Sequence, residues 1–136
     1  MPHDQAKVEE TAAWLNKAKD DLRAANIDLA ADPPLVEDAL FHCQQAVEKT
    51  VKSFLTWHDQ PFRKTHNLVE LGMQCVDVDP SIEPVLQEAA KLSEYATKYR
   101  YPGETTAVVE EASAGLELAQ NVVEQVLARL PSEARP

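Results

Sequence analysis

Residues 36–54 read VEDALFHCQQAVEKTVKSF, and this stretch has the hydrophobic periodicity of an α-helix. Intervals of three and four residues separate its main apolar side chains, which are Val36, Leu40, Cys43, Val47, Val51 and Phe54. Such spacing places them on one side of a helix. On roughly the opposite side lie Phe41, Gln45, Glu48 and Lys52, so the aromatic ring is predicted to be exposed or to meet another surface. The stretch therefore predicts a helix over residues 35–58 with one face that must be buried.

The segments on either side have the same helical character. Residues 4–31 carry a strict seven-residue apolar repeat, made of Val8, Leu15, Leu22 and Leu29. Further helices are predicted from Asn67, from about Ser81 to Tyr99, and over 105–130, the first of them short. Only 3 glycines occur in 136 residues, and alternating strand patterns are missing. We therefore predict an all-α protein, an up-and-down antiparallel four-helix bundle with an additional short helix.

Length and charge limit the classes of function. The 136 residues suit one domain over 1–130, with 131–136 predicted to be a disordered tail. The formal net charge of −10 argues against DNA and against general binding to nucleic-acid backbones. We find no signal peptide and no apolar run long enough for a membrane span, so we expect a cytoplasmic protein that does not bind membranes.

Residue types that carry chemistry are sparse in this sequence. A di-metal bundle requires Glu-x-x-His pairs, and no histidine of this sequence has a glutamate three positions before it. We therefore predict neither a metal site nor a cofactor. Three scattered glycines cannot form a phosphate-binding loop. Cys43 and Cys75 form no CxxC pair, and we interpret both as reduced, packed thiols rather than nucleophiles.

Basic residues gather locally in spite of the acidic balance. The segment 49–66 contains four basic residues and only one acidic residue, Asp59. The four basic residues are Lys49, Lys52, Arg63 and Lys64. His66 ends this segment. The alternative for such a cluster is a solvated rim whose cations complement helix ends.

A second basic group precedes the last predicted helix, with Arg100 between Tyr99 and Tyr101. If the bundle brings it close to His66, the two groups form a cationic pocket. Arginine then contacts phosphate with its fork of donors, and tyrosine stacks on a base.

Three short elements of the chain are similar to a known family. They are Gln44-Gln45-Ala46-x-Glu48-Lys49-x-x-Lys52, then Thr65-His66-x-Leu68, then Arg100-Tyr101-Pro102. In this order they resemble the HEPN family (higher eukaryotes and prokaryotes nucleotide-binding) over roughly residues 10–128.

The resemblance implies a helical bundle, commonly a homodimer, that is often encoded beside a minimal nucleotidyltransferase. Such pairs act as toxin–antitoxin modules or as substrate-binding partners. Many members are metal-independent ribonucleases whose signature is an arginine, then four to six intervening residues, then a histidine. Here Thr105, Thr106 and Ala107 stand where that histidine would follow Arg100. The signature is missing, so we lean against an enzyme.

The resulting hypothesis is a non-catalytic binding protein. It would hold a nucleotide or other phosphorylated ligand, RNA included, through Arg63, Lys64, His66, Tyr99, Arg100 and Tyr101. The helix motif of Gln44, Gln45, Glu48, Lys49 and Lys52 would support this site, although Glu48 and Lys52 could equally pair only with each other. Phe41 would lie in a homodimer interface. Two alternatives stay open: a divergent ribonuclease that uses His66, and a purely structural protein-interaction module.

Overall fold

The computed structural model describes residues 4–96 and 107–136, and their secondary structure is entirely helical. The side chains of residues 95 and 96 are outside this description. The elements in chain order are α1 (Gln5–Ala30), α2 (Val36–Trp57), α3 (Leu68–Val78), η1 (Pro80–Ile82), α4 (Glu83–Ala89), η2 (Ala90–Ala96), α5 (Val109–Leu127) and η3 (Ser132–Ala134). The predicted all-α class is confirmed.

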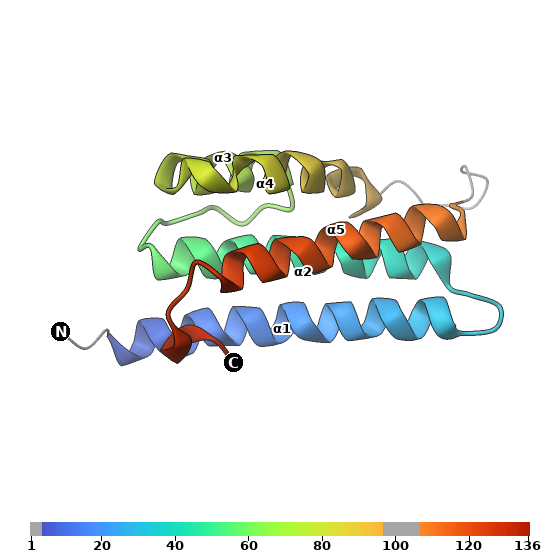
Figure 1. Ribbon diagram of the computed structural model, residues 1–136, viewed down its shortest axis with the longest axis horizontal. Helices are drawn as coiled ribbons and strands as arrows, with labels where there is room; N and C mark the ends of the chain where they lie inside the picture. The colour runs from blue at the N-terminus through green and yellow to red at the C-terminus, as the bar shows by residue number, and fades with distance from the viewer. Residues whose placement is uncertain (1–3, 97–106) are drawn as a thin grey trace.

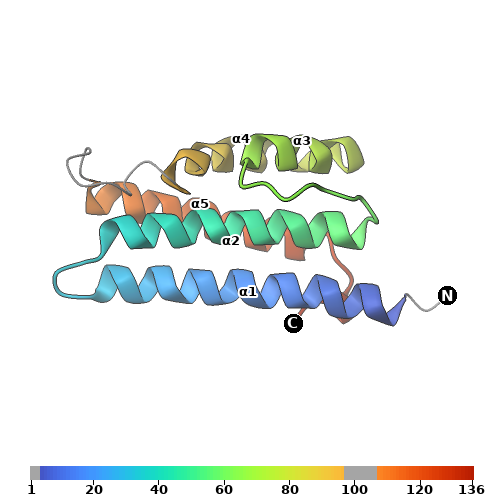
Figure 2. The same cartoon turned by 180° about the vertical axis from the view of Figure 1, so that it is seen from behind.

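The helices stack in three layers (Figures 1 and 2). α1 forms one outer layer, α2 and α5 lie side by side in the middle, and α3 and α4 form the other outer layer. The long segments α1, α2, α4 with η2, and α5 alternate in direction, and α3 lies in the connection between the second and third (Figure 1). The molecule is therefore an up-and-down helical bundle with an added short helix.

Helix ends follow local chemistry. The Asp4 carboxylate accepts from the N–H of Ala6 and caps α1. The Asn67 side chain accepts from the N–H groups of Val69 and Glu70, as the sequence predicted for the start of α3. The segment predicted as one helix over 81–99 is instead divided into η1, α4 and the 3₁₀ segment η2. In η2 the Ser93 hydroxyl accepts from the N–H of Leu68, which ties this segment to the start of α3.

α2 is the central helix, because it packs against α1, α3, η2 and α5. All residues over 50–55 are buried, so its burial extends around the whole helix rather than along one stripe. The side that carries Glu48 and Lys52, predicted to lie opposite the apolar stripe, is therefore interior.

The end of the chain differs from the sequence-based prediction. Residues 131–136, predicted to be disordered, contain the short helix η3, which packs against α1. Ala134 is fully buried there, and the Arg135 guanidinium donates to the carbonyl of Leu130 at 2.8 and 3.0 Å. The buried Ala134 side chain and the hydrogen bonds of Arg135 hold this segment in place. Its amino-acid composition alone had suggested a disordered tail.

Within the described ranges, every helix falls short of the combined length and hydrophobicity that a bilayer span requires.

Candidate functional site

A spacing of four residues places Gln44, Glu48 and Lys52 on one side of α2, and all three are buried. Glu48 is 3% exposed and Lys52 is 8% exposed. The segment that joins α2 to α3 runs back along α2 and covers this side (Figure 2). Charged groups are rarely buried without partners, so their contacts define what this side of α2 does.

The Glu48 carboxylate is the centre of these contacts. Its Oε1 lies 2.6 Å from Nδ1 of His66, and its Oε2 lies 3.2 Å from Nζ of Lys52. The Gln44 amide donates to the main-chain carbonyl of His66 at 3.3 Å, and Gln45 donates to the Gln44 side-chain oxygen at 2.8 Å. The helix motif therefore fixes both the ring and the backbone of His66. Glu48 and Lys52 pair with each other, but that pairing is only part of their role.

Two half-buried aromatic rings lie beside Lys52 in this cluster. Nζ of Lys52 lies 5.5 Å from the centre of the Trp14 ring and 5.7 Å from that of Phe62. The two rings pack edge to face, with centres 6.3 Å apart. Cation–π attraction and the ion pair with Glu48 together offset the desolvation cost of burying the Lys52 ammonium group.

His66 connects this buried cluster to the surface, because its side chain is 72% exposed. An ionised carboxylate only accepts hydrogen bonds, so the contact with Glu48 assigns the proton to Nδ1. Nε2 is then left for a ligand. It accepts a proton when the ring is neutral and donates to an anion when the ring is protonated.

The predicted pocket residues have different surroundings. Lys64 is exposed and forms no ion pair with any residue that the structure describes. Arg63 is exposed but is bound through Nε to Glu70 at 2.6 Å, and this hydrogen bond raises the pKa of Arg63. Lys49 is bound to Asp21 at 2.6 Å. Most of the local basic charge counted in the sequence is thus matched by an acid.

The other residues predicted from the sequence for the ligand site and the dimer interface are Tyr99, Arg100, Tyr101 and Phe41. Tyr99, Arg100 and Tyr101 lie outside the described residues. Phe41, predicted to lie in a dimer interface, is half-buried on α2, with its ring 5.6 Å from that of His42.

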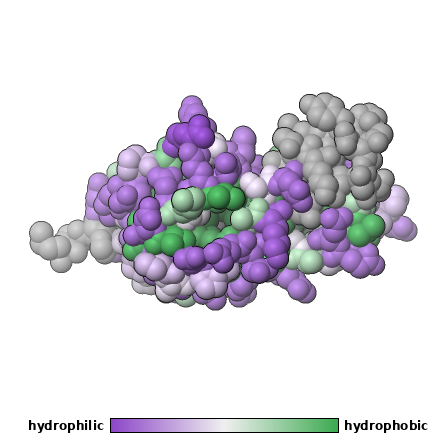
Figure 3. Space-filling view, turned by 90° about the horizontal axis from the view of Figure 1, so that it is seen from above, coloured by the Kyte–Doolittle hydropathy of each residue, from purple (hydrophilic) through white to green (hydrophobic). Residues whose placement is uncertain are grey.

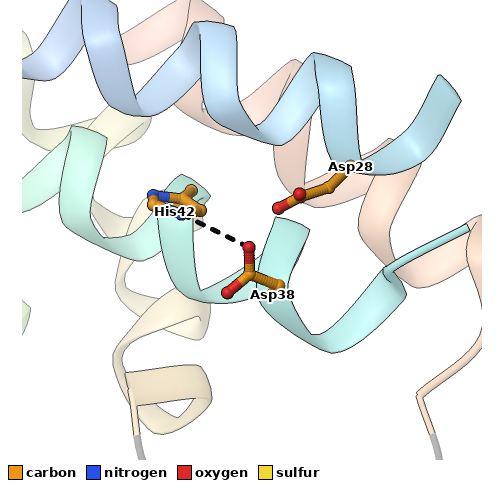
Figure 4. Close-up of side chains that lie close together, drawn as sticks. All are labelled: Asp28, Asp38 and His42. Atoms are coloured by element: carbon orange, nitrogen blue, oxygen red, sulfur yellow. Dashed lines mark ion pairs between the residues drawn. The ribbon is translucent and has the colours of Figure 1, made fainter. Parts of the chain in front are cut away.

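A second polar cluster lies between α1 and α2, and the sequence did not single it out. Asp21 is buried and accepts from two partners, Nδ1 of His42 at 2.8 Å and Nζ of Lys49 at 2.6 Å. Nε2 of His42 lies 3.4 Å from Oδ2 of Asp38, one turn earlier on α2 (Figure 4). Asp28 points toward this pair from α1. The available signal was a pair of acids, seven residues apart, within a helix face that is otherwise apolar.

Asp28 is the least satisfied of these groups. It is 7% exposed, and its Oδ2 has no hydrogen-bond partner among the described residues. Burial, followed by the hydrogen bond and charge of Asp38, raises the pKa of Asp28 to about 6. Asp28 is buried whereas Asp38 is exposed, and burial beside a second carboxylate disfavours the ionised form of Asp28.

The two cysteines have no exposed face for nucleophilic chemistry. Both are fully buried, and burial raises the pKa of each thiol to about 12. Because the thiolate is the reactive form, we expect native protein at pH 8 to react with iodoacetamide far more slowly than protein unfolded in urea. Mass spectrometry of the labelled chain measures this ratio. Fast, stoichiometric labelling of Cys43 or Cys75 in the native state would contradict the packed-thiol interpretation.

An apolar groove separates α3 from α4. It has a volume of about 380 Å³, and Leu68, Val69, Gly72, Met73, Val76 and Leu86 supply its apolar lining. Figure 3 shows hydrophobic side chains around this hollow. Asp77 and Glu83 stand at its rim. Val69 and Met73 are large hydrophobic residues left exposed, which is typical of surfaces that meet another protein.

The family model of the HEPN domain matches residues 11–130 of the chain. No curated protein and no solved structure matches the chain.

Proposed function

The chain belongs to the HEPN domain family, and from this premise we propose that it is a non-catalytic module that binds a phosphate-bearing ligand, a nucleotide or RNA. The proposed binding surface is the outer face of His66. The observation that carries the proposal is that buried Glu48 holds one ring nitrogen of His66 while 72% of the side chain stays exposed.

Local donors are needed because the net charge of −10 repels polyanions at long range. His66, fixed at Nδ1, presents Nε2 with little loss of side-chain freedom on binding. Lys64, two residues earlier, has a free ammonium group with respect to the described residues. Arg100, Tyr99 and Tyr101 complete the proposed pocket as further donors and stacking groups. Arg63 contributes less, because Glu70 already occupies its guanidinium.

The proposed protein partners follow from the family. HEPN chains are often encoded beside minimal nucleotidyltransferases, and we place this chain in such a cytoplasmic pair, of toxin–antitoxin or substrate-binding type. A homodimer through the α2 side that bears Phe41 is part of the same proposal.

Calorimetry with ATP, GTP and short RNAs tests the binding site. His66→Gln keeps a donor for Glu48 but loses Nε2, and Lys64→Gln removes one charge. Each should weaken binding about tenfold, as expected for loss of one charge-assisted hydrogen bond. Arg100→Ala should have a similar effect.

The matched control is Arg23→Gln, which removes one charge from an exposed position on α1. It should bind as the wild type does. If none of these ligands binds, or if the three site variants bind like the control, the proposal is wrong.

The Glu48–His66 pair also favours a second candidate function, a divergent ribonuclease. A carboxylate that holds Nδ1 of a histidine and leaves Nε2 exposed is an arrangement suited to general acid–base catalysis. This function predicts RNA cleavage that persists in EDTA and disappears in His66→Gln. Intact RNA after incubation with the chain, alone and with its nucleotidyltransferase partner, would eliminate it.

The groove between α3 and α4 favours the third candidate, an interaction module without a ligand. It predicts a complex with the nucleotidyltransferase that His66→Gln leaves intact and that Met73→Asp disrupts.

A further inference from the structure

The side chains of Asp28, Asp38 and His42 converge on one small volume between α1 and α2 (Figure 4). One oxygen of each carboxylate and a ring nitrogen of His42 all lie within 4.8 Å of one another. Ligand atoms at about 2.0–2.2 Å around a zinc ion are separated by about 3.4 Å in a tetrahedral site. Small side-chain adjustments therefore bring all three atoms into ligand range.

His42 is oriented for this role by Asp21. Its Nδ1 lies 2.8 Å from Oδ1 of Asp21, and Oδ2 of that carboxylate is held by Lys49 at 2.6 Å. The contact assigns the ring proton to Nδ1 and turns the Nε2 lone pair toward Asp38. A lone pair that faces a carboxylate oxygen at 3.4 Å is stabilised by a proton on Nε2 or by a cation between the two atoms. In metal-binding histidines the N–H of the second ring nitrogen commonly donates a hydrogen bond to a carboxylate in this way.

Asp28 supplies an independent sign of a missing partner. Its Oδ2 is buried and accepts no hydrogen bond from the described residues, although the side chain points at Asp38 and His42. Leaving a buried acceptor unsatisfied is costly, and native structures seldom do so. A cation at this place satisfies Asp28, Asp38 and His42 together.

We propose that Asp28, Asp38 and His42 form a binding site for a divalent transition-metal ion of the zinc type. Two carboxylates balance the charge of such an ion, and one imidazole favours zinc over magnesium or calcium, which prefer oxygen ligands. Three protein ligands leave a further coordination position for water. The site is built from different residues than the His66 surface, and it does not depend on the proposed function. It also revises the expectation from sequence, which considered Glu-x-x-His pairs and not the Asp38-x-x-x-His42 pair with an acid from the neighbouring helix.

Calorimetric titration of the metal-free chain with Zn²⁺, and separately with Mg²⁺, tests the proposal. We expect one Zn²⁺ per chain, no comparable binding of Mg²⁺, and an increase in the thermal midpoint on addition of Zn²⁺. Asp28→Asn and His42→Gln should each weaken Zn²⁺ binding at least tenfold and remove the thermal shift. Asp21→Asn, which acts only through His42, should weaken binding about tenfold.

His66→Gln is the matched control, because it removes a more exposed histidine and should leave the Zn²⁺ affinity unchanged. Asp28→Asn puts a neutral group of the same shape in place of a carboxylate whose Oδ2 has no hydrogen-bond partner among the described residues, so the variant should retain the fold. Equal Zn²⁺ binding by Asp28→Asn and wild type, or loss of binding only in His66→Gln, overturns the proposal. Absence of Zn²⁺ binding to the wild type also overturns it.

Discussion

Glu48→Ala should lower the free energy of unfolding by about 3–5 kcal/mol, as expected when one member of a buried ion pair is removed. The substitution leaves the Lys52 ammonium, 8% exposed, without its anion between Trp14 and Phe62. It also releases His66, and with it the segment that covers α2. Urea unfolding followed by circular dichroism measures the loss.

Two further variants separate the effect of the buried charges on stability from the effect of side-chain volume. Lys52→Met alone leaves the Glu48 carboxylate with only its His66 and Gln44 contacts, and it should also be destabilising. In the double variant Glu48→Gln/Lys52→Met, neutral groups of similar volume replace both charges, and much of the stability should return. If Glu48→Ala costs less than about 1 kcal/mol, Glu48 and Lys52 are not the centre of the buried cluster.

A single substitution at the same position, Glu48→Gln, links stability to the candidate site. Glu48→Gln does not touch a ligand at Nε2 of His66, yet it weakens the interaction that orients the ring. Its effect on ligand binding should therefore approach that of His66→Gln. A site that depends only on charge at the surface would not respond to this change.

Local sequence signals located the long helices of this fold, but they did not show that the segment predicted as one helix over 81–99 is divided. Spacings of three and four residues identified α2, and the Asn67 side chain correctly indicated where α3 begins. Both signals act over a few residues, so they are visible without knowledge of the tertiary structure. The pattern over 131–136 was misleading because the burial of Ala134 depends on contact with α1, more than a hundred residues away in sequence.

The candidate sites depend on contacts between segments, and only part of them was predictable. Resemblance to the HEPN motifs selected Glu48, Lys52 and His66, but that Glu48 binds both of the others follows only from the fold. Asp21 and Asp28 were hidden beside the repeated leucines of α1. The buried face of a helix is wider than one heptad position, so it can include charged residues beside the leucines. The role of such a charged residue can be assigned only when the residue of α2 that it contacts is known.

The second large effect is expected in the core, where Leu40→Ala should destabilise the fold by about 2–5 kcal/mol. Leu40 is fully buried and faces Gly115 of α5, at the place where the two middle helices meet. A Cβ added at Gly115 would lie 3.1 Å from Cδ2 of Leu40 and 3.3 Å from Cδ2 of Leu92. The absence of a side chain at 115 thus lets Leu40 fill the interface.

This geometry predicts that the effects of the two positions are not additive. In the wild type, Gly115→Ala gains about 1 kcal/mol of helix propensity but meets crowding that costs about 1–3 kcal/mol, so it should be neutral or destabilising. After Leu40→Ala the closest of these contacts is gone, and Gly115→Ala should become stabilising because the methyl group fills part of the cavity. Ala114→Gly, at an exposed position of the same helix, reports the propensity difference alone. If unfolding in urea gives additive effects to within about 0.5 kcal/mol, the close approach of α2 and α5 at Gly115 does not determine this part of the core.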